Sequence, residues 1–471
     1  MNTMKNFLST AALALVGAVM AGCSNDDNVQ QSPNNDKVIT LTTTLSLDND
    51  DATNRAIAVD FGNKKATKTF AEGDMIVVFY KDANNLTRRV ISNPLTAGNI
   101  HNDGKSADFT TTFMNTPGVN AQLRYVYPYF DAQPSIATDA EINDANTLCY
   151  DYIGDQFGLL SKNDYLDLAT FDGNFSGTSL PASASLTNRL AILAFTLKNS
   201  DGSSAITSSI LNMNISDGVN SYNVMSVDED VIYAAIHPLT TPTALVITAS
   251  DGTNDYEKTL TSRTYAAGNF YNMPVRMIPK VNLSSSSGDF NVTGDMIVTG
   301  TPAGNLNIKL PNKECTVTLD NVNPLGAHSV TIQSGNSNMT VKLKGTSKLE
   351  SIQAYSAPAL IIDEAAPGGT VIIESDNLTP LDNNNVIING GTVMARNNDD
   401  GYEAVSGNLT VNGGAVYLAG GQYTSAVSGT ISGSVTLYGR NGSQWDSSDT
   451  ATQYVTSDNT SGDPASWTYW Q

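Results

Sequence analysis

The chain has 471 residues, is rich in Thr, Ser, Asn, Gly and Asp, and carries a formal net charge of −21. No Lys/Arg cluster is longer than Arg88-Arg89, which excludes nucleic acid and anionic lipid headgroups as charge-driven partners. The length predicts two to four domains, and the composition is typical of strands and turns. We therefore expect an all-β protein whose acidic surface keeps it soluble.

Residues 1–22 have the pattern of a secretory signal peptide. Lys5 precedes the apolar run Ala11–Ala21, which is too short to span a membrane. The run ends in Val19-Met-Ala-Gly-Cys23, which resembles a bacterial lipoprotein cleavage box. We predict that Cys23 is lipidated, for example with palmitate. Each CH₂ group of the acyl chain that is buried in the membrane contributes about 0.8 kcal/mol to the free energy of membrane binding. The alternative is an ordinary signal peptide with an incidental cysteine.

Residues 23–37 form a polar linker that begins with the acidic segment Ser24-Asn-Asp-Asp27. This segment resembles the tag that directs some lipoproteins to the outer face of the outer membrane. The linker therefore predicts a surface-exposed lipoprotein of the cell outer membrane. The other two cysteines, Cys149 and Cys315, are too far apart to suggest a disulfide framework or a CxxC metal site, and we expect small buried side chains at both.

The first predicted strand covers residues 38–47. Hydrophobic residues and Thr43 alternate here with Thr and Ser, which indicates a strand with one buried face. An acidic loop, residues 48–55, follows and ends at Arg55. The chain then continues through the apolar run 75–80 and further strands at 108–113 and 122–129.

A second block begins near residue 181 with the apolar run 190–197, which the turn-forming Asn199-Ser-Asp-Gly202 marks as a strand. Strands are also expected at 231–236, 244–249 and 256–260. Turn signals every 8–12 residues are typical of β-sandwiches. We therefore predict two consecutive sandwiches, residues 38–180 and 181–280.

Four features follow one another up to residue 280: the lipoprotein box, the first strand with its Arg-containing loop, the segment Phe70-Ala-Glu-Gly-Asp-Met-Ile-Val-Val-Phe79, and the closing Ala267-Gly-Asn-Phe-Tyr271. This order resembles the fimbrillin superfamily, which includes the major- and minor-fimbrium (Mfa-like) subunits. The resemblance implies export to the cell surface and removal of the first strand by an arginine-specific protease, with Arg55 as the cleavage residue. The vacated groove then accepts a donor strand from another subunit. Alternatively, Arg55 is an ordinary loop residue and the strand stays.

Residues 281–471 are richer in Gly, Asn, Ser and Val and follow a linker expected at Ser284-Ser-Ser-Ser-Gly288. Asn389-Gly-Gly-Thr-Val393 recurs 23 residues later as Asn412-Gly-Gly-Ala-Val416. Glu403-Ala-Val-Ser-Gly407 recurs, with Ser for Glu, after 22 residues at Ser425. One coil of a parallel β-helix has about this length. The segment resembles the β-helical carbohydrate-binding domains of surface proteins, most clearly over residues 386–440.

The last 27 residues contain all three tryptophans of the chain. Aromatic rings stack on sugar rings, so this tail is a candidate ligand-binding end, with Trp445, Trp467, Tyr469 and Trp470 as binding residues. The alternative is a bulky apolar cap that closes the open end of the β-helix.

Nothing in the sequence has the pattern of a catalytic site. His101, His237 and His328 lie in different blocks, and no GxSxG, HExxH or paired-carboxylate motif is present. Arg396 with Asn397-Asn-Asp-Asp-Gly401 could imitate a Ca²⁺ and base cluster of a polysaccharide lyase, but such clusters are also typical of turns. We expect no enzyme activity, no cofactor and no metal.

The sequence thus predicts a surface-exposed fimbrial (pilus) subunit at a tip or accessory position. It would assemble by strand exchange with other fimbrial subunits and mediate cell adhesion through a host or bacterial surface glycan or protein. The apparent β-helix occupies the C-terminus, from which shaft subunits of the family donate a strand, and this argues against a shaft role. The alternative is a lipid-anchored glycan-binding protein that does not polymerise.

Overall fold

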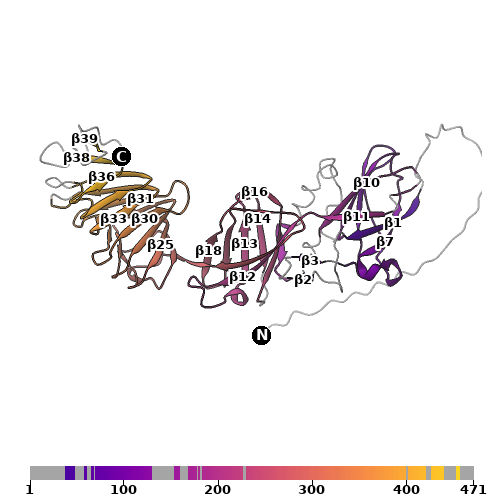
Figure 1. Cartoon of the computed structure of the whole chain (residues 1–471), viewed down its shortest axis with the longest axis horizontal. Helices are drawn as coiled ribbons and strands as arrows, with labels where there is room; N and C mark the ends of the chain where they lie inside the picture. The colour runs from indigo at the N-terminus through magenta and orange to yellow at the C-terminus, as the bar shows by residue number, and fades with distance from the viewer. Residues whose placement is uncertain are drawn as a thin grey trace, which may run out of the picture.

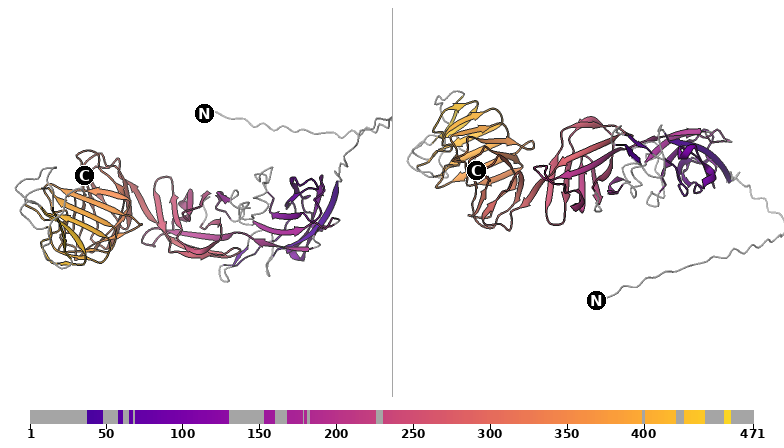
Figure 2. Two further views of the ribbon diagram at one scale, coloured as in Figure 1. Left: turned by 90° about the horizontal axis from the view of Figure 1, so that it is seen from above. Right: turned by 60° about the horizontal axis from the view of Figure 1, so that its bottom comes forward.

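The computed structural model describes residues 38–47, 58–60, 65–67, 69–129, 153–159, 168–177, 179–180, 183–225, 230–398, 401–420, 426–439 and 452–456. In these ranges the chain is built of β-strands with short 3-10 turns, η1 (Ala97–Asn99), η2 (Asn102–Gly104) and η5 (Thr207–Ser209). This confirms the all-β class. No helix in the described part is long and apolar enough to cross a membrane. The strands form three groups that follow one another along an elongated molecule (Figures 1 and 2).

The first group is an eight-stranded sheet in the order β5-β4-β8-β10-β11-β1-β7-β6. It curls back on itself, because Ser92, just after β5, bridges Thr111 of β7. Leu45, Phe109 and Tyr125 are fully buried in its core. The strands are β1 (Ile39–Leu47), β4 (Val77–Lys81), β5 (Thr87–Ile91), β6 (Ile100–His101), β7 (Ser106–Phe113), β8 (Gln122–Tyr127), β10 (Ala169–Asn174) and β11 (Ser183–Asn188). A separate hairpin pairs β2 (Ala58–Asp60) with β3 (Lys65–Thr67).

Strands β4 and β8 are buried on both faces. Val78 and Tyr80 pack into the first core, whereas Val77 and Phe79 pack into the core of the second group. Two buried faces explain why the run 75–80 is continuously apolar instead of alternating. These strands therefore join the first group to the second.

The second group has two layers around one core. One layer is β15-β12-β20, and the other is the part of a long sheet that runs β18-β17-β13-β14-β9. The predicted run 190–197 is the central strand β12, flanked by β15 and β20. The strands are β9 (Asp155–Phe157), β12 (Ala191–Lys198), β13 (Asn212–Ser216), β14 (Ser221–Met225), β15 (Ile232–Ile236), β17 (Val246–Ser250), β18 (Asp255–Thr259) and β20 (Phe270–Arg276). A short pair, β16 (Leu239–Thr243) with β19 (Arg263–Tyr265), adjoins them.

Along the chain, strands of the first group alternate with strands of the second. Strand β9 precedes β10 in the chain but pairs with β14 of the second group, whereas β11 follows at residue 183 and pairs with β1 and β10 of the first. The chain therefore crosses between the groups more than once before it settles in the second.

The third group is a stack of parallel strands in three ladders around its own core. Thr392 pairs with Ala415 and Val405 bridges Val427, so equivalent positions of the sequence repeat lie side by side. One repeat unit therefore extends from one strand of a ladder to the next strand of the same ladder. The first ladder is β22 (Gly288–Asn291), β24 (Leu306–Lys309), β26 (Val330–Gln333), β29 (Ser351–Gln353) and β32 (Leu381–Asp382). The second is β23 (Met296–Gly300), β25 (Cys315–Val322), β27 (Met339–Lys344), β30 (Leu360–Glu364), β33 (Asn385–Ile388), β35 (Asn408–Val411) and β37 (Ile431–Ser432). The third is β28 (Thr346–Leu349), β31 (Thr370–Ser375), β34 (Thr392–Asn397), β36 (Ala415–Ala419) and β38 (Val435–Gly439), after which β39 (Thr452–Thr456) pairs antiparallel. We call these strands the ladder stack.

The prediction of a serine-rich linker between the second group and the ladder stack is wrong. Strand β21 (Ile278–Asn282) pairs with β18 of the second group on one side and with β23 of the ladder stack on the other. One thirteen-stranded sheet therefore runs through both groups. Leu283 is fully buried, and the backbone N–H of Ser286 donates to its carbonyl at 2.9 Å, so residues 283–287 form a tight turn from β21 to β22, the first strand of the ladder stack.

Candidate functional site: the first strand and its groove

Strand β1 lies inside the first sheet, although it is the first strand of the chain. It pairs antiparallel with β7 over eight residue pairs, Ile39–Phe113 to Ser46–Ser106. On its other side it pairs parallel with β11 over four, Thr44–Ser183 to Leu47–Leu186. Only the second half of β1 is therefore flanked by strands on both sides.

The outer face of β1 carries a row of hydroxyl groups that are bonded across the strands. Thr40 and Thr42 bond the hydroxyls of Thr112 and Thr110, each at 3.0 Å. Ser46 bonds the Ser185 hydroxyl at 3.0 Å. Such cross-strand pairs favour one register. Because they lie on an exposed face, water can also bond to these hydroxyl groups.

The inner face of β1 is aliphatic except at its centre. Leu45 is fully buried, and Ile39 and Leu41 pack against the same core. Between them lies Thr43, which is 1% exposed and whose Oγ1 is 3.5 Å from the hydroxyl oxygen of the buried Tyr125. Burial raises the pKa of Tyr125 to about 12, so this phenol stays neutral and needs a hydrogen-bond partner.

Asp108 of β7 connects β1 to the edge strand β6. Its Oδ1 accepts a hydrogen bond from Thr44 at 2.6 Å, and its Oδ2 lies 2.9 Å from Nε2 of His101. The bond from Thr44, followed by that to His101, holds the pKa of Asp108 below its ordinary value. The carboxylate is therefore a charged acceptor that helps hold β1 in place.

The chemistry of this site is that of strand pairing. Without β1, the facing N–H and C=O groups of β7 and β11 would lose their partners, and the inner face would open a groove over Phe109 and Tyr125. A β-strand of matching pattern restores both the backbone ladder and the side-chain contacts.

The predicted site residues lie outside the described residues. They are Cys23 (lipidation), Arg55 (cleavage) and the aromatic residues Trp445, Trp467, Tyr469 and Trp470. Cys149 also lies outside, whereas Cys315 is a free, buried thiol as expected. The sequence analysis did not identify Asp108 or Tyr125 as site residues. For Asp108 a signal was available, because the alternation Asp108, Thr110, Thr112 mirrors that of β1.

In the segment that could imitate a lyase cluster, the described residues Arg396 and Asn397 are the last two residues of β34. Asn397 is fully buried, and its Nδ2 donates to the carbonyl of Leu378 at 2.7 Å. Arg396 pairs with Glu374 at 2.8 Å. Among the described residues, no group of His, Cys, Asp and Glu side chains could hold a metal ion.

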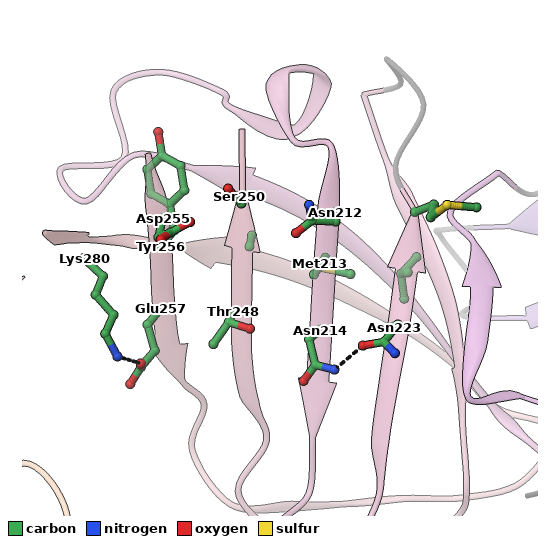
Figure 3. A pocket seen from close by; sticks show the side chains of 13 residues that line it. Asn212, Met213, Asn214, Asn223, Thr248, Ser250, Asp255, Tyr256, Glu257 and Lys280 are labelled. Atoms are coloured by element: carbon green, nitrogen blue, oxygen red, sulfur yellow. Dashed lines mark hydrogen bonds and ion pairs between the residues drawn. The ribbon is translucent and has the colours of Figure 1, made fainter. Parts of the chain in front are cut away.

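A separate hollow of about 460 Å³ lies over the exposed face of β13, β14, β17 and β18 (Figure 3). Two amide groups bond across it, since Asn214 donates to Asn223 at 2.7 Å. Asn223 in turn donates to Asp155 of β9 at 2.9 Å. At its side, Lys280 bonds Glu257 at 3.1 Å. These side chains already form hydrogen bonds with one another, which leaves fewer donors and acceptors for a ligand. The hollow is therefore a weaker candidate for a binding site than the groove.

No protein-family model and no curated protein matches the chain. Among solved structures, it is similar to a candidate cell adhesion protein from Bacteroides uniformis, with 13% identity, a TM-score of 0.28, and 50% of this chain and 94% of that chain covered. A fimbrial assembly protein from Parabacteroides distasonis matches with 9% identity and a TM-score of 0.28 over 50% and 92%. A candidate cell adhesion protein from Bacteroides ovatus matches with 12% identity and a TM-score of 0.26 over 52% and 95%. Scores of this size do not establish a common fold.

Proposed function

We propose that this chain is a fimbrial subunit of the fimbrillin type that is exported as a lipoprotein and assembles by strand exchange. The observation that supports this most is the position of β1, which lies between β7 and β11 and leads directly into the segment that contains Arg55. A single cut after this strand leaves it held only by non-covalent contacts. Its departure opens a groove that a strand of another subunit fills.

The ladder stack is proposed as the adhesive module, with the fold of a parallel β-helix. In Figures 1 and 2 β1 lies near one end of the described molecule and the ladder stack at the other. A subunit that accepts a strand at the β1 end would display the stack away from the fibre. This arrangement supports a tip or accessory position and a glycan or protein ligand on another cell.

Mass spectrometry of the N-terminus on intact cells tests the processing steps. Before protease treatment we expect an acylated Cys23, and after treatment with an arginine-specific protease we expect a new terminus at Ala56. Arg55→Lys keeps the charge and should abolish this cut, while cleavage elsewhere stays unchanged. If wild type and Arg55→Lys give the same termini, Arg55 is not the processing residue.

Assembly is tested with the same two proteins. Processed wild type, mixed with other fimbrial subunits, should enter high-molecular-weight polymers, whereas Arg55→Lys should not. If neither enters polymers but the full chain binds sugars on a glycan array, the protein is the non-polymerising, lipid-anchored glycan binder instead.

A further inference from the structure

The inner face of β1 has one polar residue, Thr43, and it lies at the centre of the strand. Tyr125, which is fully buried, presents its hydroxyl there, and among the hydrogen bonds of the described residues its partner is Thr43 at 3.5 Å. Nearby, the Oγ1 of Thr111, a residue that is 1% exposed and pairs with Leu41, has no hydrogen-bond partner in the described part of the chain. The floor of the groove therefore contains the buried hydroxyl groups of Tyr125 and Thr111 within an otherwise apolar core.

A strand that enters such a groove can slip along it. A slip by one residue would turn the hydroxyl row inward, so the alternation already forbids it. A slip by two residues keeps the alternation, since Leu41, Thr43 and Leu45 share one face. It would, however, place a leucine against the Tyr125 hydroxyl and leave that buried group without a partner.

We propose that Thr43 and Tyr125 form a register pin, and that the groove selects an incoming strand with a hydroxyl side chain at this one inner position and aliphatic side chains on either side of it. The inference rests on the proposed strand exchange and adds the sequence class of the partner strand. A single buried polar pair in an apolar seam fixes the register of coiled coils by the same physical logic. The hydroxyl row on the outer face adds support but little selectivity, because water can replace its bonds.

The test uses the full chain with a recognition sequence for a specific protease in the segment 48–57, so that it does not depend on Arg55. After cleavage, fluorescent peptides of residues 38–47 compete for the groove, and fluorescence polarisation reports their affinity. The three peptides are the wild type, Thr43→Val and Thr42→Val. The two variants carry the same chemical change at neighbouring positions, one inner and one outer.

We expect Thr43→Val to bind about tenfold more weakly than Thr42→Val, the effect of one unsatisfied buried hydroxyl. In a Tyr125→Phe chain the two peptides should bind alike, because the group that distinguishes them is gone. Circular dichroism and thermal unfolding verify that this chain folds, and the peptide comparison on the unmodified groove stands without it.

The outcomes separate the two proposals. Equal binding of Thr43→Val and Thr42→Val to the unmodified groove overturns the register pin but leaves strand exchange intact. Failure of all three peptides to enter a cleaved, folded chain overturns strand exchange itself. A tenfold difference that persists in Tyr125→Phe also overturns the pin, since the selectivity would then come from other contacts.

Discussion

Asp251 organises the turn between β17 and β18. Its Oδ1 accepts hydrogen bonds from the backbone N–H groups of Thr253 at 2.8 Å and Asn254 at 2.6 Å, and its Oδ2 accepts from the Tyr256 hydroxyl at 2.9 Å. The bonds from Asn254, with those from Thr253 and Tyr256, lower the pKa of Asp251 to about 2. Asp in a tight turn is predictable from sequence, because its side chain bonds the backbone two or three residues on.

This carboxylate makes stability depend on pH at the acid end. The folded pKa of about 2 lies below the ordinary value of 3.8, so ionised Asp251 stabilises the fold above pH 3.8 and this contribution is lost as the pH falls toward 2. We expect the stability difference between wild type and Asp251→Asn to be constant at pH 5–7 and to shrink between pH 4 and 2. Urea unfolding measures it, and an NMR titration that places the Asp251 pKa near 3.8 would contradict it.

At the scale of elements, the alternation of β1 and the apolar run of β12 were enough to predict both strands, with ends within one or two residues. Less apolar strands, such as β10 with the sequence ATFDGN, were missed because their position in the sheet is decided by partners far away in the chain. The glycine repeat predicted the stacking of β34 on β36 from spacing alone.

The ladder stack should be sensitive to glycine substitution where successive repeat units touch. Gly414 has φ +85°, and a Cβ there would collide with the carbonyl oxygen of Gly391 in the preceding repeat unit. Gly368 has φ +83° but open space around it. We expect Gly414→Ala to lower the free energy of unfolding by about 3 kcal/mol and Gly368→Ala by about 1 kcal/mol, the difference being the collision. Equal losses in urea unfolding would show that conformation alone matters.

At the scale of the whole molecule, four charged side chains bind the second group to the ladder stack. Lys280 bonds Glu257 at 3.1 Å and Asp320 at 2.8 Å, and Lys344 bonds Glu257 at 2.5 Å and Asp320 at 3.3 Å. Glu257 and Asp320 are almost fully buried. Burial opposes the ionisation of Asp320, but the two lysines outweigh it and hold the pKa of Asp320 below its ordinary value.

Glu257 lies on β18 and Lys344 on β27, four strands apart in the long sheet. The four side chains therefore bridge strands of the second group and of the ladder stack. The joint is therefore built from continuous strands and buried ion pairs, which disfavours free rotation of the ladder stack.

Removing one cation from this joint should cost more than removing a surface ion pair. Lys344→Met leaves two buried carboxylates to share Lys280, and we expect a loss of about 2 kcal/mol in the free energy of unfolding, reduced from the fully buried case because both lysines are partly exposed. The control is Lys309→Met, whose pair with Asp289 at 2.6 Å lies on the exposed surface, so this substitution should cost clearly less than Lys344→Met. If Lys344→Met and Lys309→Met lowered the free energy of unfolding equally in urea, the buried charges would not stabilise the junction between the second group and the ladder stack.

The amino-acid sequence by itself determined what depends on local pattern: the β class, the alternation of β1, the apolar run of β12 and the spacing of the stacked strands that repeat along the third group. These follow from periodicity, which needs no knowledge of distant residues. Only the tertiary structure decided which strands flank β1, that β21 continues one sheet across the expected serine linker, and that Tyr125 meets Thr43. These contacts join residues far apart in the chain, and their free energy comes from burial and pairing that exist only after the chain has folded.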